Sequence, residues 1–272
     1  MARSPPAARL AGVSASFVHD WIDLDGAYNV RDLGGLPTGT GVTRAGVLLR
    51  ADALDDLTDD DDVACLVDQR SLAHVFDLRS QSERDQRGRG RLGATEVAYS
   101  ELEVIVEADL ERRRQERSAA FAAGDDPEEV LAAGYAELLD LGRTAFPAAL
   151  TRLVAPGGTP ALVHCAAGKD RTGVLVALLL DAAGVDRAAI VADYAATQER
   201  MAPIIERLAA ASAFHAMAEQ LPAFVYEARA GTMERFLARL DERWGGAAEF
   251  FTANGADPDV VDEWRALFVA GN

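Results

Sequence analysis

The chain has 272 residues, of which 49% are hydrophobic and 26% charged, a composition typical of a folded globular protein. Its net charge of -17 argues against binding to nucleic acid or to an anionic membrane surface, because the long-range field repels polyanions. An anionic substrate must therefore be captured by a local positive pocket. We expect a single domain at residues 16–272, preceded by a flexible tail at residues 1–15 that shows no periodicity.

The cysteine content and the apolar stretches indicate the compartment. Cys65 and Cys165 lie far apart in the sequence, so we expect no structural disulfide, which fits a reducing environment. The amino-terminal residues lack the apolar core of a signal peptide, and the longest apolar stretch, VLVALLL at 174–180, is too short to span a bilayer. The sequence thus predicts a cytoplasmic protein with no integral membrane segment, leaves export without a signal peptide open, and predicts no oligomeric state.

The first half of the chain predicts two strands with a helix between them. AGVLLRA, from residue 45, and LAHVFDLRS, around Val75, each read as a strand that ends in polar residues. Between them, Thr58 is expected to cap a helix whose first turn is acidic, since carboxylates complement the helix dipole there. The aspartates of this region lack the glycine and terminal glutamate of a calcium loop, so a solvated helix start is favoured.

The second half is mostly helical in pattern. Residues 101–142 predict a helical hairpin, with Asp126 and Pro127 at the start of its second arm, and we expect this hairpin to act as a lid. PALVHC then reads as a buried strand, and RTGVLVALLLDAAG as a helix that Gly184 closes. Further helices are predicted at 187–210, 231–243 and 258–269. The predicted fold class is α/β, with a central, mostly parallel sheet flanked by helices and a helical lid insertion.

The segment HCAAGKDRTG, residues 164–173, joins that strand to that helix. It places Arg171 six positions after Cys165, a spacing that is weak evidence alone because arginine is abundant in this chain. The preceding histidine, the glycine within the loop, the threonine after the arginine and the strand-loop-helix context make the pattern specific. Together they predict a phosphate-binding loop around a cysteine nucleophile.

Each residue type in this loop meets a requirement of phosphoryl transfer to sulfur. An ordinary thiol, with a pKa of about 8.5, is mostly protonated at neutral pH, whereas amides converging at a helix N-terminus favour the thiolate. We expect the backbone amides of the loop, including those of Ala166 and Ala167, to bind first the sulfur and then the phosphate oxygens. The planar fork of Arg171 is suited to grip two phosphate oxygens in the transition state.

The other loop residues have supporting roles. Gly168 lets the backbone turn inward where a Cβ would obstruct the amides. Thr172 is expected to donate its hydroxyl to the thiolate, and His164 to orient the cysteine from the strand. Lys169 is the only lysine in the chain, and its ammonium would add positive charge beside the phosphate, which favours substrates with several phosphates, such as phosphoinositides.

The leaving oxygen needs a proton, and two carboxylic acids are candidates for supplying it. Asp170 directly precedes Arg171, whereas Asp77 ends the strand around Val75. If that strand runs parallel to PALVHC, both acids reach the same edge of the sheet. The sequence does not decide between them, and pairing with Arg79 is an equally good reading of Asp77.

The chain resembles the bacterial tyrosine and phosphoinositide phosphatases typified by mycobacterial protein tyrosine phosphatase B. The resemblance rests on HCAAGKDRTG and on three further segments: NVRDLGG at 29–35, FDLRS at 76–80 and ADYAATQER at 192–200. It implies a phosphatase fold with a two-helix lid, no metal or organic cofactor, and activity on phosphotyrosine, with variable activity on phosphoserine, phosphothreonine and phosphoinositides.

By position, the resemblance also assigns roles. Cys165 matches the nucleophile, Arg171 the phosphate-binding arginine, Lys169 and Asp170 the paired charges of the loop, and Asp77 the aspartate proposed as general acid. NVRDLGG is interpreted as a structural support of the loop through Arg31 or Asp32.

Two other functions use a similar loop. A module that binds phosphorylated protein or lipid without turnover would need the same anion cradle, but it has no need of a nucleophile. A rhodanese-like sulfurtransferase also carries a cysteine in an anion cradle, but its shorter loop suits sulfur chemistry. The expected partner is therefore a phosphorylated protein or a phosphoinositide, acting as substrate.

Overall fold

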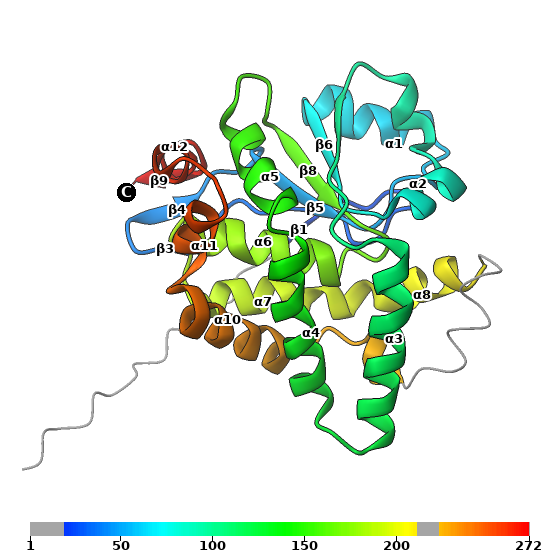
Figure 1. Ribbon diagram of the computed structural model, residues 1–272. Coiled ribbons are helices and arrows are strands. Elements are labelled where there is room, and N and C mark those ends of the chain that lie inside the picture. The colour runs from blue at the N-terminus through cyan, green and yellow to red at the C-terminus, as the bar shows by residue number, and fades with distance from the viewer. Residues whose placement is uncertain (1–18, 211–222, 272) are drawn as a thin grey trace, which may run out of the picture.

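The computed structural model describes residues 19–210 and 223–271, arranged as a central sheet with helices packed around it (Figure 1). The strand order of the main sheet is β1-β2-β5-β8-β6-β7, in which the last four strands are parallel and the first two pair antiparallel. Its strands are β1 (Asp20–Trp21), β2 (Arg31–Asp32), β5 (Leu48–Ala51), β6 (His74–Asp77), β7 (Ala98–Glu101) and β8 (Ala161–His164). The mostly parallel sheet confirms the predicted fold class.

A small antiparallel sheet lies beside the main one. It joins β3 (Pro37–Thr38) and β4 (Gly41–Thr43) to β9 (Val269–Gly271), so the end of the described chain packs against the segment that follows β2.

Helices occur in both halves of the chain. The α-helices are α1 (Asp60–Ala64), α2 (Gln81–Arg87), α3 (Glu107–Ala122), α4 (Pro127–Leu141), α5 (Ala145–Val154), α6 (Asp170–Ala182), α7 (Arg187–Ala196), α8 (Met201–Ala210), α10 (Ala230–Trp244), α11 (Ala247–Ala253) and α12 (Pro258–Phe268). A π-helical turn (Cys65–Gln69) continues α1, and short 3-10 helices lie at Gly90–Ala94, Thr197–Arg200 and Ala223–Tyr226. Within the two described ranges, no helix combines the length and the apolar character needed to cross a membrane.

Strand β8 lies at the centre of the sheet and is buried on both faces. Its side chains alternate between two cores, because successive residues of a strand point to opposite faces. Val163 packs with α6 and the helices around it, whereas Leu162 packs with Leu49 and Val75 on the side of α1. The loop that follows β8 therefore starts from a strand that is packed on both faces of the sheet.

Most predicted elements are confirmed, with two corrections. The hairpin predicted at 101–142 is α3 and α4, and Asp126 caps α4 as expected. The cap of α1 is Asp59, whose carboxylate accepts from the amide of Asp61, so the prediction of Thr58 is wrong by one residue. The helix predicted at 187–210 is interrupted at 197–200, where Thr197 accepts a hydrogen bond from the buried Arg31. The expected tail at 1–15 falls outside the described residues.

Candidate active site

The loop between β8 and α6 turns sharply after Cys165. Cys165 is buried, with 2% of its surface exposed, and Asp170 begins α6. Gly168 has a φ of 66°, and a Cβ at this position would lie 2.4 Å from the carbonyl oxygen of Ala51. Only glycine avoids both the strained backbone and this clash, as the sequence predicts.

The carbonyl groups of the loop are held from outside. The donors are His164 Nδ1 for the carbonyl of Cys165 (3.2 Å), Ala53 N and Arg207 Nη2 for that of Ala166 (3.1 and 2.8 Å), and Asn29 Nδ2 and Arg50 Nη2 for that of Gly168 (3.1 and 2.7 Å). In a planar trans peptide the carbonyl and the following N–H point in opposite directions. The amides that follow these carbonyls therefore point away from these donors, which is the arrangement that an anion cradle requires.

Arg171 is oriented by a carboxylate that the sequence analysis missed. Its Nη1 and Nη2 donate to Glu83 at 2.5 and 2.8 Å, and Nη1 also donates to the carbonyl of Leu78 at 3.3 Å. Burial alone would raise the pKa of Glu83, but the Arg171 guanidinium lowers it to about 2. This pair uses one edge of the fork and leaves Nε on the other edge for a phosphate oxygen. The sequence feature that could have located Glu83 is the capping box that Ser80 and Glu83 form at the start of α2.

A buried ion cluster supports the loop from behind. Asp193 of α7 accepts from Arg31 Nε at 2.8 Å and from Arg50 Nη1 at 2.5 Å. Burial would raise the pKa of Asp193, but the two guanidinium groups outweigh it and bring the pKa to about 2. Arg31 also donates to the side chain of Asn29, which holds Gly168. The NVRDLGG segment thus supports the loop through Arg31, while Asp32 accepts from two glycine amides in a turn.

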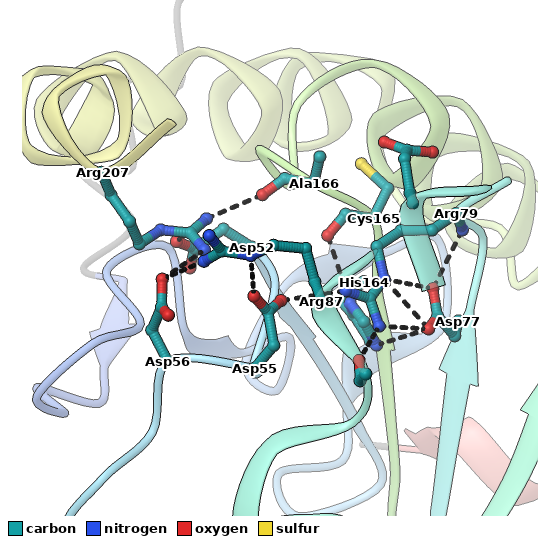
Figure 2. Close-up of polar contacts among 12 residues, drawn as sticks. Asp52, Asp55, Asp56, Asp77, Arg79, Arg87, His164, Cys165, Ala166 and Arg207 are labelled. Atoms are coloured by element: carbon teal, nitrogen blue, oxygen red, sulfur yellow. Dashed lines mark hydrogen bonds and ion pairs between the residues drawn. The ribbon is translucent and has the colours of Figure 1, made fainter. Parts of the chain in front are cut away.

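Asp77 lies next to His164 but is enclosed by other partners. The two residues are paired across β6 and β8, and Asp77 Oδ2 lies 3.8 Å from His164 Nε2. Arg79 donates to its carboxylate from Nε and Nη2 (3.0 and 2.7 Å), and the hydroxyl of Tyr99 donates as well. Burial would raise the pKa of Asp77, but His164, Arg79 and Tyr99 together hold it well below its usual range. Figure 2 shows the sulfur of Cys165 pointing away from this carboxylate.

Asp170 is the more accessible of the two acids, with 37% of its side chain exposed. It accepts a hydrogen bond from the hydroxyl of Tyr135 on α4 at 2.7 Å, and Lys169 Nζ lies 3.2 Å away. Burial favours a raised pKa for Asp170, but Lys169, the Tyr135 hydroxyl and Arg117 together lower it. Asp170 therefore stands at the loop as a carboxylate held by α4.

The remaining predicted residues line or support the loop. Lys169 is buried, and its Nζ donates to the carbonyls of Val225 and Glu227 at 2.7 and 3.4 Å, so part of its charge is directed away from the cradle. Within the described ranges, the buried hydroxyl of Thr172 has no hydrogen-bond partner. Burial lowers the pKa of His164, and the Asp77 carboxylate opposes this shift. Ala166 and Ala167, both partly exposed, form the outer turn of the loop.

A family model and several known proteins match this chain. A family model described as the tyrosine phosphatase family matches residues 22–270. The chain is 28% identical over 277 residues to the triple specificity protein phosphatase PtpB of Mycobacterium tuberculosis, which covers 91% of this chain and 98% of that protein. It is 30% identical over 266 residues to a putative tyrosine-protein phosphatase of Cupriavidus necator, with 96% and 92% covered. A tyrosine-protein phosphatase of Nostoc commune is 43% identical over 65 residues, 24% of this chain and 22% of that one.

Proposed function

Because the chain belongs to the tyrosine phosphatase family, we propose that it hydrolyses phosphotyrosine through a phosphocysteine intermediate on Cys165. The observation that carries the proposal is the loop itself, in which outward-held carbonyls turn the amides inward and Arg171 stands at the start of α6. The cradle lowers the cost of a sulfur anion and then stabilises the charge of the transferring phosphoryl group.

The reaction has two steps. In the first, the sulfur of Cys165 bonds to phosphorus while the bond from phosphorus to the phenolic oxygen breaks, and that oxygen receives a proton from an acid. In the second, water attacks the phosphocysteine and gives up a proton to the same group, so phosphate leaves and the thiolate returns. Arg171 and the loop amides hold the equatorial oxygens throughout, and the hydroxyl of Thr172 is available to the departing sulfur.

We assign the acid to Asp170. It lies in the loop, is partly exposed and has one oxygen bound by Tyr135, whereas Asp77 is fully buried and its carboxylate is engaged by Arg79 and Tyr99. Asp77 then serves to hold Arg79 and to orient His164 beneath the cysteine.

The two acids can be separated by substitution. We expect Asp170→Asn to lower kcat about 10²-fold on phenyl phosphate, whose leaving group needs a proton, and far less on p-nitrophenyl phosphate. Asp77→Asn should lower thermal stability and affect both substrates alike, because it removes one of the two buried carboxylates that pair with Arg79. A selective loss on phenyl phosphate in Asp77→Asn, with Asp170→Asn unaffected, would reverse the assignment.

The pH dependence should report the bond between Tyr135 and Asp170. Tyr135→Phe removes a donor that lowers the pKa of Asp170, so that pKa should rise. A general acid works only while protonated, so the variant should keep its kcat on phenyl phosphate to a higher pH than the wild type. Tyr194→Phe is the matched control. It removes the same atom one hydrogen bond further from Asp170, because the Tyr194 hydroxyl bonds to that of Tyr135 at 2.8 Å. An equal shift in both variants, or none in Tyr135→Phe, would contradict this prediction.

The α3–α4 hairpin is proposed to act as the lid of this site. Tyr135 of α4 reaches Asp170, and Phe121 of α3 packs edge to face on Phe224 at 4.6 Å, in the segment that also binds Lys169. The hairpin thus contacts the loop directly at Asp170, and it also contacts the segment to which Lys169 is bound.

The proposal also covers the range of substrates. Phosphorylated proteins are the primary expectation, and phosphoinositides are included because the family resemblance implies them. The ammonium of Lys169 is paired with Asp170 at 3.2 Å and bound by two carbonyls, so it contributes less charge to the site than the sequence predicts. Parallel assays of the pure protein on phosphotyrosine, phosphoserine and phosphothreonine peptides and on phosphoinositide vesicles test this range. Both cysteines are free, which supports a reducing, cytoplasmic compartment as part of the proposal.

A further inference from the structure

The carbonyl of Ala166 is held by two donors that come from different parts of the chain. Ala53 donates its backbone N–H at 3.1 Å, and Arg207 of α8 donates from Nη2 at 2.8 Å. This carbonyl belongs to the same peptide unit as the N–H of Ala167, which points to the opposite side, away from both donors. The orientation of that N–H is therefore fixed by whatever holds the carbonyl.

Arg207 is itself tightly fixed. Only 7% of its side chain is exposed, and the nitrogen that holds Ala166 also lies 3.1 Å from Oδ2 of the fully buried Asp52. Its Nη1 lies 3.6 Å from Asp56 (Figure 2). Asp52 in turn accepts from the backbone amides of Tyr28 and Asn29 at 2.9 and 2.8 Å. Solvent screens such a buried pair little, so the guanidinium is held in one place.

A series of ion pairs connects Arg207 to the other side of Cys165. From Arg207 the ion pairs run in sequence through Asp56, Arg87, Asp55 and Arg79 to Asp77, which lies beside His164. His164 contacts the carbonyl of Cys165, so the two ends of this series meet the carbonyls of two successive loop residues. Figure 2 shows the series below the loop.

We propose that Arg207 is a positioning residue of the phosphate-binding loop, which keeps the Ala167 amide directed at the oxyanion and makes that geometry depend on the seating of α8. The proposal rests on the proposed phosphatase function. Arg207 does not touch the substrate and acts only through the carbonyl of Ala166.

The test compares Arg207→Gln with Arg187→Gln. Arg187 also bridges two carboxylates, those of Asp181 and Asp241, but on a part of α7 that does not contact the loop. We expect Arg207→Gln to lower kcat/KM for p-nitrophenyl phosphate about tenfold, less than loss of a whole oxyanion donor, because Ala53 still holds the carbonyl. Inhibition by orthovanadate, which occupies the same cradle, should weaken by a similar factor, and Arg187→Gln should leave both values unchanged.

A second variant separates positioning from charge balance. Arg207→Gln leaves Asp52 without its cation, so Arg207→Gln combined with Asp52→Asn removes the unpaired charge. If the carbonyl contact matters, the double variant stays impaired, and its recovery to wild-type kcat/KM would overturn the proposal. Arg207→Lys keeps the charge with fewer N–H groups and should fall between the wild type and Arg207→Gln.

Folding and the underlying activity are controlled separately. If Arg207→Gln does not melt cooperatively, Arg207→Lys decides, since wild-type vanadate inhibition in that variant would overturn the proposal. Wild-type kcat/KM in a folded Arg207→Gln would do the same. Absence of turnover in the wild-type protein would instead contradict the proposed function.

Discussion

Cys165→Ser is expected to abolish phosphate release, with a loss of about 10⁴- to 10⁶-fold in kcat. A serine hydroxyl stays protonated at neutral pH, and the amides that favour a thiolate do not make it an effective nucleophile. The loop carbonyls are held by groups that the substitution leaves in place, so the cradle should persist. Binding of a phosphotyrosine peptide, measured by calorimetry, should therefore be retained.

The second cysteine supplies the matched control. Cys65 lies in the π-helical turn after α1, partly exposed, and packs against the core on the opposite side of the sheet from α6. Cys65→Ser should keep wild-type turnover within a factor of about 2, because it changes the same atom far from the loop. Turnover surviving in Cys165→Ser but lost in Cys65→Ser would sink the phosphocysteine route.

The loop was predictable because its requirements are contiguous in the sequence. A strand, the proposed nucleophile, a glycine that allows a positive φ and an arginine in the first helical turn all fall between residues 161 and 173. Burial of β8 on both faces likewise follows from an uninterrupted apolar run. Local patterns of this kind directly indicate the conformation of the backbone.

The supports of the loop could not be predicted, because each joins residues far apart in the chain. Glu83 reaches Arg171 across 88 positions, and Arg207 reaches Asp52 across 155. Abundant arginines and aspartates offer many possible pairings, and only the folded topology selects among them. For the same reason the sequence left Asp77 and Asp170 as equal candidates, whereas the structure encloses one with Arg79 and Tyr99 and leaves the other partly exposed.

Arg171→Lys is the second substitution for which we expect a large effect. The guanidinium uses Nη1 and Nη2 for Glu83. In the proposed mechanism its other edge binds the phosphate, so one planar group performs two tasks in fixed geometry. A lysine ammonium is a point charge that would be drawn to Glu83, leaving the oxygens of the transition state without a paired donor. We expect kcat/KM for p-nitrophenyl phosphate to fall about 10²- to 10³-fold.

The matched comparison isolates geometry from charge. Arg243→Lys, in an exposed pair with Asp140, should leave turnover unchanged. Glu83→Gln keeps a hydrogen-bonding partner for Arg171 while removing the negative charge, so its loss should be smaller than that of Arg171→Lys. Because the ammonium keeps the charge and loses only the fork, near wild-type kcat/KM in Arg171→Lys would mean that electrostatic attraction alone binds the phosphate. The paired geometry of Arg171 and Glu83 would then have no part in stabilising the transition state.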